Sequence, residues 1–143
     1  MDALLEANAA LSPFCKNYME LKKGLPVRPS EMGVLNILTG RPGPHTPAVL
    51  AQMLGVSKPM ITALLASLSE NGYITKEPSM DDKRVYFIRP TKKALALANH
   101  TRAEMNRHFS KMIAQMGQEN FDALVRLAQM ANHALEANKG EIS

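Results

Sequence analysis

The chain has 143 residues, of which 45% are hydrophobic and 21% are charged, and its formal net charge is +4. This length favours a single domain or one subunit of a small oligomer, and the composition excludes a disordered or fibrous chain. The single cysteine excludes an intramolecular disulfide framework, and no apolar run approaches the ~20 residues of a membrane-spanning helix. The first residues lack the features of a signal peptide, so we expect a cytoplasmic protein.

The first third of the chain predicts three helices. Apolar side chains at helical spacing indicate a first helix over residues 2–23. Ser30 is typical of the N-cap of a second helix. Thr46 followed by Pro47 predicts the start of a short third helix, because proline is favoured at the first helical position, and Gly55 ends it.

A fourth helix follows, with Ser57 as its predicted cap and Gly72 after its last turn. Its apolar residues recur at i, i+3, i+4 and i+7, and we expect this stripe to be buried. The stripe consists of Ile61, Leu64, Leu65 and Leu68. The opposite face would then be exposed and carries mostly small side chains, namely Pro59, Thr62, Ala63 and Ala66, with Lys58 and Met60 at its margins.

Two β-rich runs come next, Tyr73–Glu77 and Arg84–Arg89, joined by the polar segment 78–83. Thr91 predicts the cap of a long fifth helix, and Gly117 separates that helix from a sixth. The expected fold is therefore mainly α with a small antiparallel β-wing, in the order α-α-α-α-β-β-α-α.

Positive charge is concentrated in the segment that contains the fourth helix and the predicted hairpin. Residues 57–93 contain seven basic and four acidic residues, whereas the remaining residues contain ten basic and nine acidic. A local excess of positive charge favours an anionic partner.

The third helix, the short Gly-Val turn and the fourth helix form a predicted helix-turn-helix, whose second helix fits a major groove about 12 Å wide. Small side chains allow a close approach to base edges. Thr62 and Ala63 are candidates for contact with a thymine methyl, Ser57 and Lys58 are candidates for phosphate contact, and Pro59 shares this surface.

The hairpin offers a second DNA-binding element. Lys83 and Arg84 at its tip are candidates for contact with a narrow minor groove of DNA, whose negative potential attracts arginine. Asp82, two residues before Arg84, is placed to orient the guanidinium or the turn, and Lys76 on the first strand is a candidate for phosphate contact. We therefore predict double-stranded DNA as the partner.

These residues carry a resemblance to a known family. LAQMLGVSKPMITALLASLSENGYITKEP followed by DDKRVYFIRPTKKA resembles the MarR family of winged helix-turn-helix repressors (multiple-antibiotic-resistance regulators). The family's wing pattern of an Asp, a basic residue and an Arg before an apolar strand and a Thr-capped helix is matched by Asp82, Lys83, Arg84 and Thr91.

The resemblance implies a ligand-responsive regulator, most simply a repressor, that acts as a homodimer on a pseudo-palindromic operator. Residues 1–24 and 95–143 would form the dimerisation region, and residues 28–93 the winged DNA-binding region. By motif position, Arg84 would be the minor-groove residue and Asp82 its supporting partner. A small-molecule effector would bind in a crevice between the two regions.

The chain departs from the family pattern at three places. Ala63 and Ser67 stand where members often carry basic residues, so that Lys58 is the one cation of the fourth helix. Pro90 replaces a usual Leu, and Ala94 replaces a common Gly. The first departure shifts the expected reading of DNA toward apolar contacts.

Other readings remain beside this one. A winged helix can hold a protein partner on the same face, with little affinity for DNA. A thiol- or metal-triggered variant of the regulator would use Cys15, or His100, Glu104 and His108, which share one helical face. We expect Cys15 to be an inert, partly buried thiol and the histidine row to be solvated or at an interface, without a metal. No nucleophile with a base, phosphate loop or carboxylate cluster is recognisable, so we expect neither an enzyme nor a cofactor.

Overall fold

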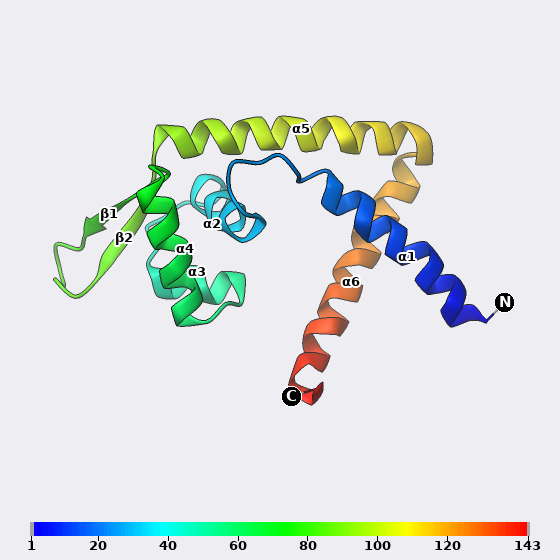
Figure 1. Cartoon of the computed structure of the whole chain (residues 1–143), viewed down its shortest axis with the longest axis horizontal. Coiled ribbons are helices and arrows are strands. Elements are labelled where there is room, and N and C mark those ends of the chain that lie inside the picture. Colours follow the sequence, from blue (N-terminus) through cyan, green and yellow to red (C-terminus); the bar gives the residue numbers. More distant parts are fainter. Residues whose placement is uncertain (1, 143) are drawn as a thin grey trace. The chain divides into compact units, whose positions relative to one another are not determined.

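The computed structural model describes the backbone of residues 2–142 and the side chains of residues 2–138. Within this range the chain forms six helices and one two-stranded antiparallel sheet in the predicted order, which confirms the predicted fold class (Figure 1). The elements are α1 (Ala3–Glu20), α2 (Pro29–Gly40), α3 (Pro47–Leu54), α4 (Lys58–Glu70), β1 (Ile74–Pro78), β2 (Tyr86–Pro90), α5 (Lys92–Met116) and α6 (Gln118–Ile142). The chain divides into two compact units, Met1–Arg102 and Ala103–Ser143.

Three predicted helix caps are confirmed by hydrogen bonds. The Thr46 hydroxyl accepts from the amide of Val49 at 3.2 Å, and the Ser57 hydroxyl accepts from the amide of Met60 at 3.2 Å. The Thr91 hydroxyl accepts from the amide of Ala94 at 3.3 Å. Each bond satisfies an amide that the first turn of a helix leaves without an intrahelical partner. Between α3 and α4, Gly55 has a φ of 66°, a left-handed conformation that favours glycine, and it allows the sharp turn of the helix-turn-helix.

The predicted cap of α2 was wrong by two residues. The N-cap is Arg28, and Ser30 lies inside the first turn behind Pro29, whose fixed φ favours the first helical position. The Glu31 carboxylate accepts from the backbone amide of Arg28 at 2.9 Å. A carboxylate therefore satisfies this helix start in place of a serine hydroxyl.

The core of the first unit lies between α2, α3, α4 and the base of the hairpin. The predicted stripe of α4 is buried, with Leu68 fully inaccessible and Ile61 1% exposed. The other core residues come from α2 (Met32, Val34, Leu35, Leu38), α3 (Leu50), the hairpin (Tyr73, Ile74, Ile88) and the start of α5 (Ala94, Ala98). This packing fixes which face of α4 points to solvent.

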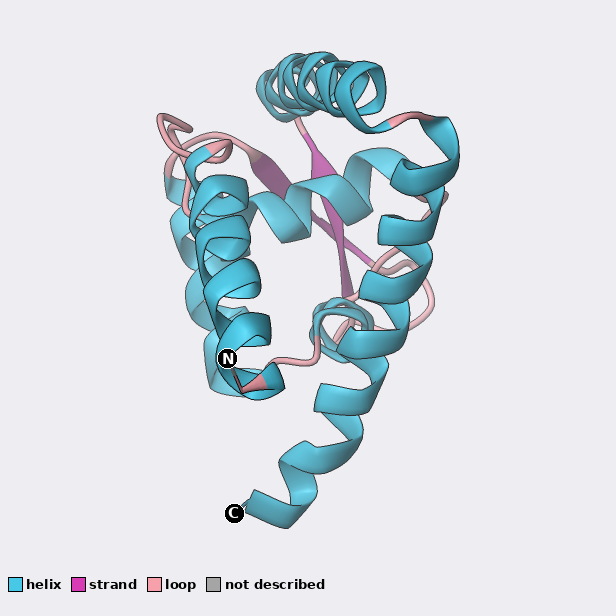
Figure 2. Cartoon of the chain, turned by 90° about the vertical axis from the view of Figure 1, so that its right-hand side faces the viewer, coloured by secondary structure: helices cyan, strands magenta, loops and turns pink. Residues whose placement is uncertain are grey.

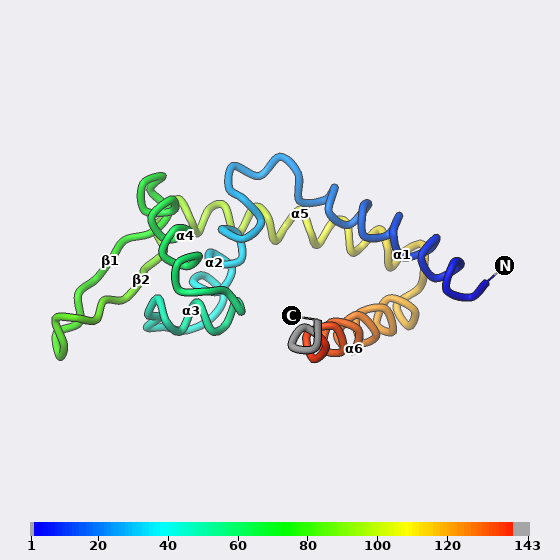
Figure 3. Tube along the Cα trace, turned by 60° about the horizontal axis from the view of Figure 1, so that its bottom comes forward, coloured from blue at the N-terminus to red at the C-terminus, as the bar shows by residue number. Residues whose placement is uncertain are grey.

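The two strands pair in antiparallel register, with Thr75 opposite Arg89 and Glu77 opposite Phe87. Figure 2 shows the two strands in magenta, and Figure 3 follows the chain from α4 out along β1 and back along β2 into α5. Buried His45 adds an isolated bridge to this hairpin, because its carbonyl accepts from the amide of Ile88 at 2.8 Å. No local sequence pattern indicates this contact.

The second strand begins at Tyr86, and its predicted start at Arg84 was wrong. The amide of Val85 donates to the Asp82 carbonyl at 3.0 Å, and the amide of Ser79 donates to the Val85 carbonyl at 2.9 Å. These bonds close a turn that includes Arg84 and removes it from the strand.

The second unit contains the C-terminal part of α5 and helix α6. Gly117, with a φ of 89°, separates the two helices as predicted. The rings of Phe109 and Phe121 pack with their centroids 5.5 Å apart across this turn. Among residues 2–142 no single helix has the length and apolarity to cross a membrane, although α3 and α4, bent at 112°, pass that test as a pair.

Candidate nucleic-acid interface

The exposed face of α4 carries the residues predicted from its amphipathic pattern. Ser57, Lys58, Pro59, Thr62 and Ala63 are all exposed. They begin the second helix of a helix-turn-helix, and the buried stripe behind them holds this face outward. The structure therefore presents small side chains and one cation on the first two turns of the helix.

Two hydroxyl groups on this face also bond to their own helix. The Thr62 hydroxyl donates to the Lys58 carbonyl at 2.9 Å, so its oxygen remains free to accept from a partner. The Ser57 hydroxyl oxygen accepts its cap bond, so its proton remains free to donate. Ser57 thus suits an anionic acceptor such as phosphate, and Thr62 suits a donor or an apolar methyl group.

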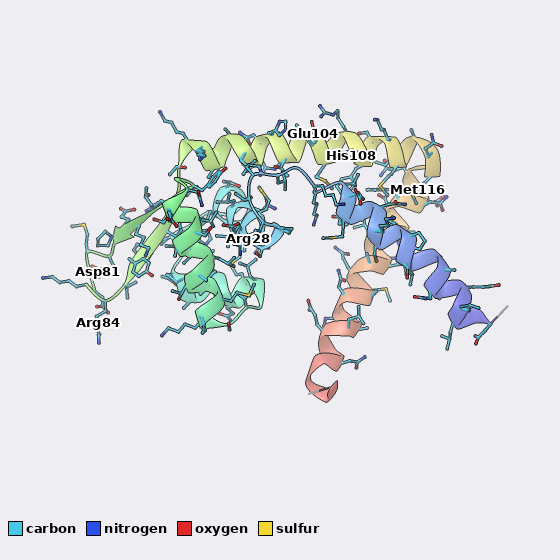
Figure 4. All side chains as sticks on the ribbon, in the orientation of Figure 1. Arg28, Asp81, Arg84, Glu104, His108 and Met116 are labelled. Carbon is cyan, nitrogen blue, oxygen red and sulfur yellow. The ribbon has the colours of Figure 1, made fainter. Side chains whose placement is uncertain are left out.

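The hairpin ends in a turn that is organised around Asp82 and Arg84. The Asp82 carboxylate accepts from the backbone amide of Arg84 at 3.0 Å and from its guanidinium at 3.3 and 3.4 Å. The backbone hydrogen bond, followed by the guanidinium bonds, lowers the pKa of Asp82 below its ordinary value. Figure 4 shows Arg84 and its neighbour Asp81 at the outer end of the hairpin.

The other predicted cations of the hairpin differ in their surroundings. Lys83 is exposed at the tip. Lys76 is exposed on β1, and its ammonium lies 5.1 Å from the centroid of the Tyr86 ring. Arg89 pairs with Glu77 at 2.5 Å across the strands. Lys83 therefore has the less restricted ammonium of the two lysines.

A groove of about 680 Å³ runs between α3, the start of α4 and the hairpin. It brings together three predicted residues, Lys58, Thr62 and Arg84, from two separate elements. The remaining predicted residues lie outside its lining, on the outer face of α4 (Ser57, Pro59, Ala63) or on the hairpin (Lys76, Asp82, Lys83). The groove joins the helix and hairpin surfaces into one continuous face.

Sequence reasoning missed the contribution of α3 and of the start of β2. The groove is also lined by Thr46, by Pro47, Ala48 and Ala51 of α3, and by Val85 and Tyr86 of the hairpin. The Thr46-Pro47 signal marked a helix start, and the antiparallel hairpin was predicted, but neither pattern indicated that both segments line one groove.

Cys15 is exposed, and the prediction that it is partly buried was wrong. Every side chain of α1 except Tyr18 is exposed in the chain, because no other part of the first unit covers this helix. Among the residues that the structure describes, no group of three or more His, Cys, Asp or Glu side chains is arranged to hold a metal ion.

A three-helix core that ends in a helix-turn-helix and continues into a β-hairpin defines a winged helix-turn-helix protein. Residues 23–85 match the model of the MarR family. The helix-turn-helix region of this chain, residues 23–85, is therefore of the MarR-family type, and β1, β2 and their turn form the wing.

Solved structures share this fold over nearly the whole chain. FabT from Streptococcus pneumoniae in complex with DNA is 21% identical with a TM-score of 0.81, and the match covers 95% of this chain and 99% of FabT. CouR, a transcriptional repressor bound to a 23-mer DNA duplex, is 23% identical with a TM-score of 0.72, covering 91% and 92%. PcaV from Streptomyces coelicolor, in complex with its natural ligand, is 16% identical with a TM-score of 0.75, covering 94% and 97%. No curated protein sequence matches the chain.

Proposed function

We propose that this protein is a transcriptional regulator that binds a specific site in double-stranded DNA as a homodimer. The observation that carries the proposal is the continuous face formed by α4, the groove and the wing, with Lys58 and Arg84 both at the groove. FabT and CouR, which share the fold, are DNA complexes.

In this proposal the start of α4 enters the major groove. Thr62 and Ala63 contact base edges, where the methyl of thymine suits their small apolar groups. Ser57 and Lys58 bind phosphates through a free hydroxyl proton and an ammonium. Pro59, the next residue, packs against the DNA beside them. Because α4 has one cation, base discrimination depends more on shape and apolar contact than on bidentate hydrogen bonds.

The wing then enters the adjacent minor groove. Arg84 supplies the cation that a narrow minor groove attracts, and Asp82 holds its guanidinium in place. Lys83, and to a lesser degree Lys76, contact flanking phosphates. The phosphate backbone that separates the two DNA grooves lies along the protein groove between Lys58 and Arg84.

The homodimer is supported by apolar side chains that the single chain leaves exposed on its terminal helices. On α1 these are Leu4, Leu5, Leu11, Phe14 and Met19, and on α6 they are Val125, Leu127, Met130 and Leu135. Exposed apolar surface of this extent is typical of a protein interface. A two-fold dimer would present two α4 helices to half-sites about 34 Å apart, one turn of DNA.

We further propose that the regulator is a repressor whose DNA affinity responds to a small molecule. PcaV binds a natural ligand on the same fold. A ligand that favours a different separation of the two α4 helices would release the DNA, and a few kcal/mol of differential affinity are enough for that shift.

Selection of bound duplexes from a random pool, followed by a salt series, tests this function. We expect the wild-type chain to enrich a pseudo-palindromic sequence and to lose affinity steeply with salt, because phosphate contacts release counterions. A protein-interaction module would enrich no sequence and would give a flat salt series. That result would replace the DNA-binding proposal with the protein-partner alternative.

A further inference from the structure

The chain leaves α4 through three residues whose backbone carbonyls have no partner within the helix. The Asn71 carbonyl accepts from the Lys93 ammonium at 2.8 Å, and the Gly72 carbonyl accepts from the Thr91 hydroxyl at 2.7 Å. The Tyr73 carbonyl accepts from the backbone amide of Thr91 at 3.0 Å. All three donors belong to the start of α5, so consecutive carbonyls after α4 are bonded to one turn of another helix.

We call the bonded segments 71–73 and 91–93 the α4–α5 joint. Lys93 makes two contacts at this joint. Its ammonium also lies 4.5 Å from the centroid of the Tyr73 ring, which is buried. The last turn of α4 contains no basic residue, so the charge of Lys93 complements the negative end of the α4 dipole. Because a cation–π contact and a charged hydrogen bond act on one ammonium, its position is better defined than that of an ordinary surface lysine.

The same joint forms the base of the wing. Ile74, the first residue of β1, pairs with Pro90, the last residue of β2, directly beside Tyr73 and Thr91. The end of α4, the base of the wing and the first turn of α5 are therefore tied at one point. Neither strand can change direction there without disturbing the bonds to Thr91.

We propose that Lys93 is a positioning residue for DNA recognition, which passes a reorientation of α5 to α4 and the wing together. This inference rests on the proposed DNA-binding function. Lys93 holds the two DNA-reading elements in one relative position through its contacts with Asn71 and Tyr73, and this role needs no contact between Lys93 and DNA.

The test compares Lys93→Met with Lys92→Met in the full chain. Lys92 is the adjacent exposed lysine, so both variants lose the same charge. Lys93→Arg, which keeps a donor and a cation, serves as the rescue, and Lys93→Gln is a milder variant in case Lys93→Met does not fold. Amide hydrogen exchange at Thr91 in the free protein reports the joint, and DNA affinity is measured on the duplex selected by the wild-type chain.

We expect Lys93→Met to accelerate exchange at Thr91 and to weaken DNA binding about fivefold, with the salt slope unchanged. Lys92→Met and Lys93→Arg should match the wild type on exchange, and Lys93→Gln should fall between. Equal amide exchange rates at Thr91 in the Lys93→Met and Lys92→Met proteins would overturn the claim that Lys93 stabilises the joint. A salt slope reduced by about one in Lys93→Met would instead show a direct phosphate contact and overturn the positioning role.

The exchange measurement needs no DNA, so the two proposals fail separately. A wild-type chain that binds no duplex at any salt concentration overturns the DNA-binding function and the role of Lys93 in it. Wild-type DNA binding combined with identical affinities for the Lys93→Met and Lys92→Met proteins overturns only the role of Lys93.

Discussion

Arg84 is exposed over 90% of its side chain and yet is held by a single carboxylate on two of its nitrogen atoms. The guanidinium has five N–H groups, so several remain free to donate to DNA while Asp82 keeps the plane oriented. An oriented side chain loses less conformational entropy on binding than a free one. The formal charge of the wing tip is zero, because Asp81 and Asp82 cancel the charges of Lys83 and Arg84. The oriented guanidinium nevertheless suits the tip to binding in a minor groove.

Replacement of Arg84 by Ala should weaken DNA binding by about 1 to 3 kcal/mol, because the minor-groove cation is lost while the fold is kept. Fluorescence anisotropy with the selected duplex measures this change. Arg126→Ala, at an exposed arginine of α6, is the matched control and should bind as the wild type does. Unchanged affinity in the Arg84→Ala protein would remove the wing from the mechanism.

The Asp82–Arg84 link should be insensitive to pH in the range from about pH 5 to 8. The pKa of Asp82 is lowered from 3.8, first by the Arg84 backbone bond and then by its guanidinium. A depressed carboxyl pKa means that the link is fully present above the ordinary value and is lost as the pH falls through the lowered one. Carboxyl carbon shifts in an NMR titration measure this pKa, and a midpoint above 3.8 would contradict the structure.

At the scale of the element, α4 links stability to recognition. Its four buried residues form the centre of the core, and its outer face carries the proposed base contacts. A polar bond adds to this packing, because the Ser67 hydroxyl donates at 2.8 Å to buried Glu31 of α2. Ser67, a departure from the family's usual basic residue, therefore braces the helix in place of binding phosphate.

Leu68→Ala should reduce the free energy of unfolding by about 2 to 5 kcal/mol, because Leu68 is fully buried and its truncation leaves a cavity. Urea denaturation followed by circular dichroism measures the loss. Ser69→Ala, at the next and exposed position, should change stability by less than about 0.5 kcal/mol. A similar stability for both variants would mean that the helix is rotated from the position described here.

Elements with local signals were predictable from the sequence, whereas features made by distant segments were not. Thr46 and Ser57 cap helices because the hydroxyl and the amide it bonds lie within three residues, a pattern that the sequence shows directly. The prediction of Ser30 as a cap was wrong because the helix begins earlier, at Pro29. The Glu31 carboxylate, inside the helix, accepts from the Arg28 amide at the helix start.

The candidate site was predictable in the same partial way. The buried stripe of α4 determined which residues face outward, and the Asp82-Lys83-Arg84 pattern identified the wing tip. The start of β2 was misplaced because Asp82 draws the Arg84 amide into a turn despite the β-prone residues that follow. The groove wall from α3 and the bridge from His45 to Ile88 depend on tertiary packing, which local patterns do not report.

At the scale of the whole molecule, the chain leaves large apolar side chains exposed on both terminal helices. Leu11 of α1 is 61% exposed and Leu135 of α6 is 65% exposed, and neither contributes to the core of the winged helix. Burying such side chains between two copies is favourable by about 1.5 to 3 kcal/mol for each fully covered leucine. Under the proposed function, specific DNA binding would then depend on assembly, because a single winged helix would read only one half-site.

Leu11→Glu should shift the chain from dimer to monomer, since a charge at an apolar interface must lose its hydration without gaining a partner. Sedimentation velocity distinguishes the 15.7 kDa chain from a species of twice that mass. Asn17→Glu, also exposed on α1, adds the same charge at a polar position and should leave the dimer intact.

The monomeric variant should keep weak, salt-sensitive affinity for DNA and lose its preference for the two-half-site sequence, because only the dimer fixes the spacing of about 34 Å between the two α4 helices. A Leu11→Glu protein that stays dimeric would exclude this position of α1 from the interface, and a wild-type monomer that still prefers the paired sequence would show that the spacing is not read by a dimer.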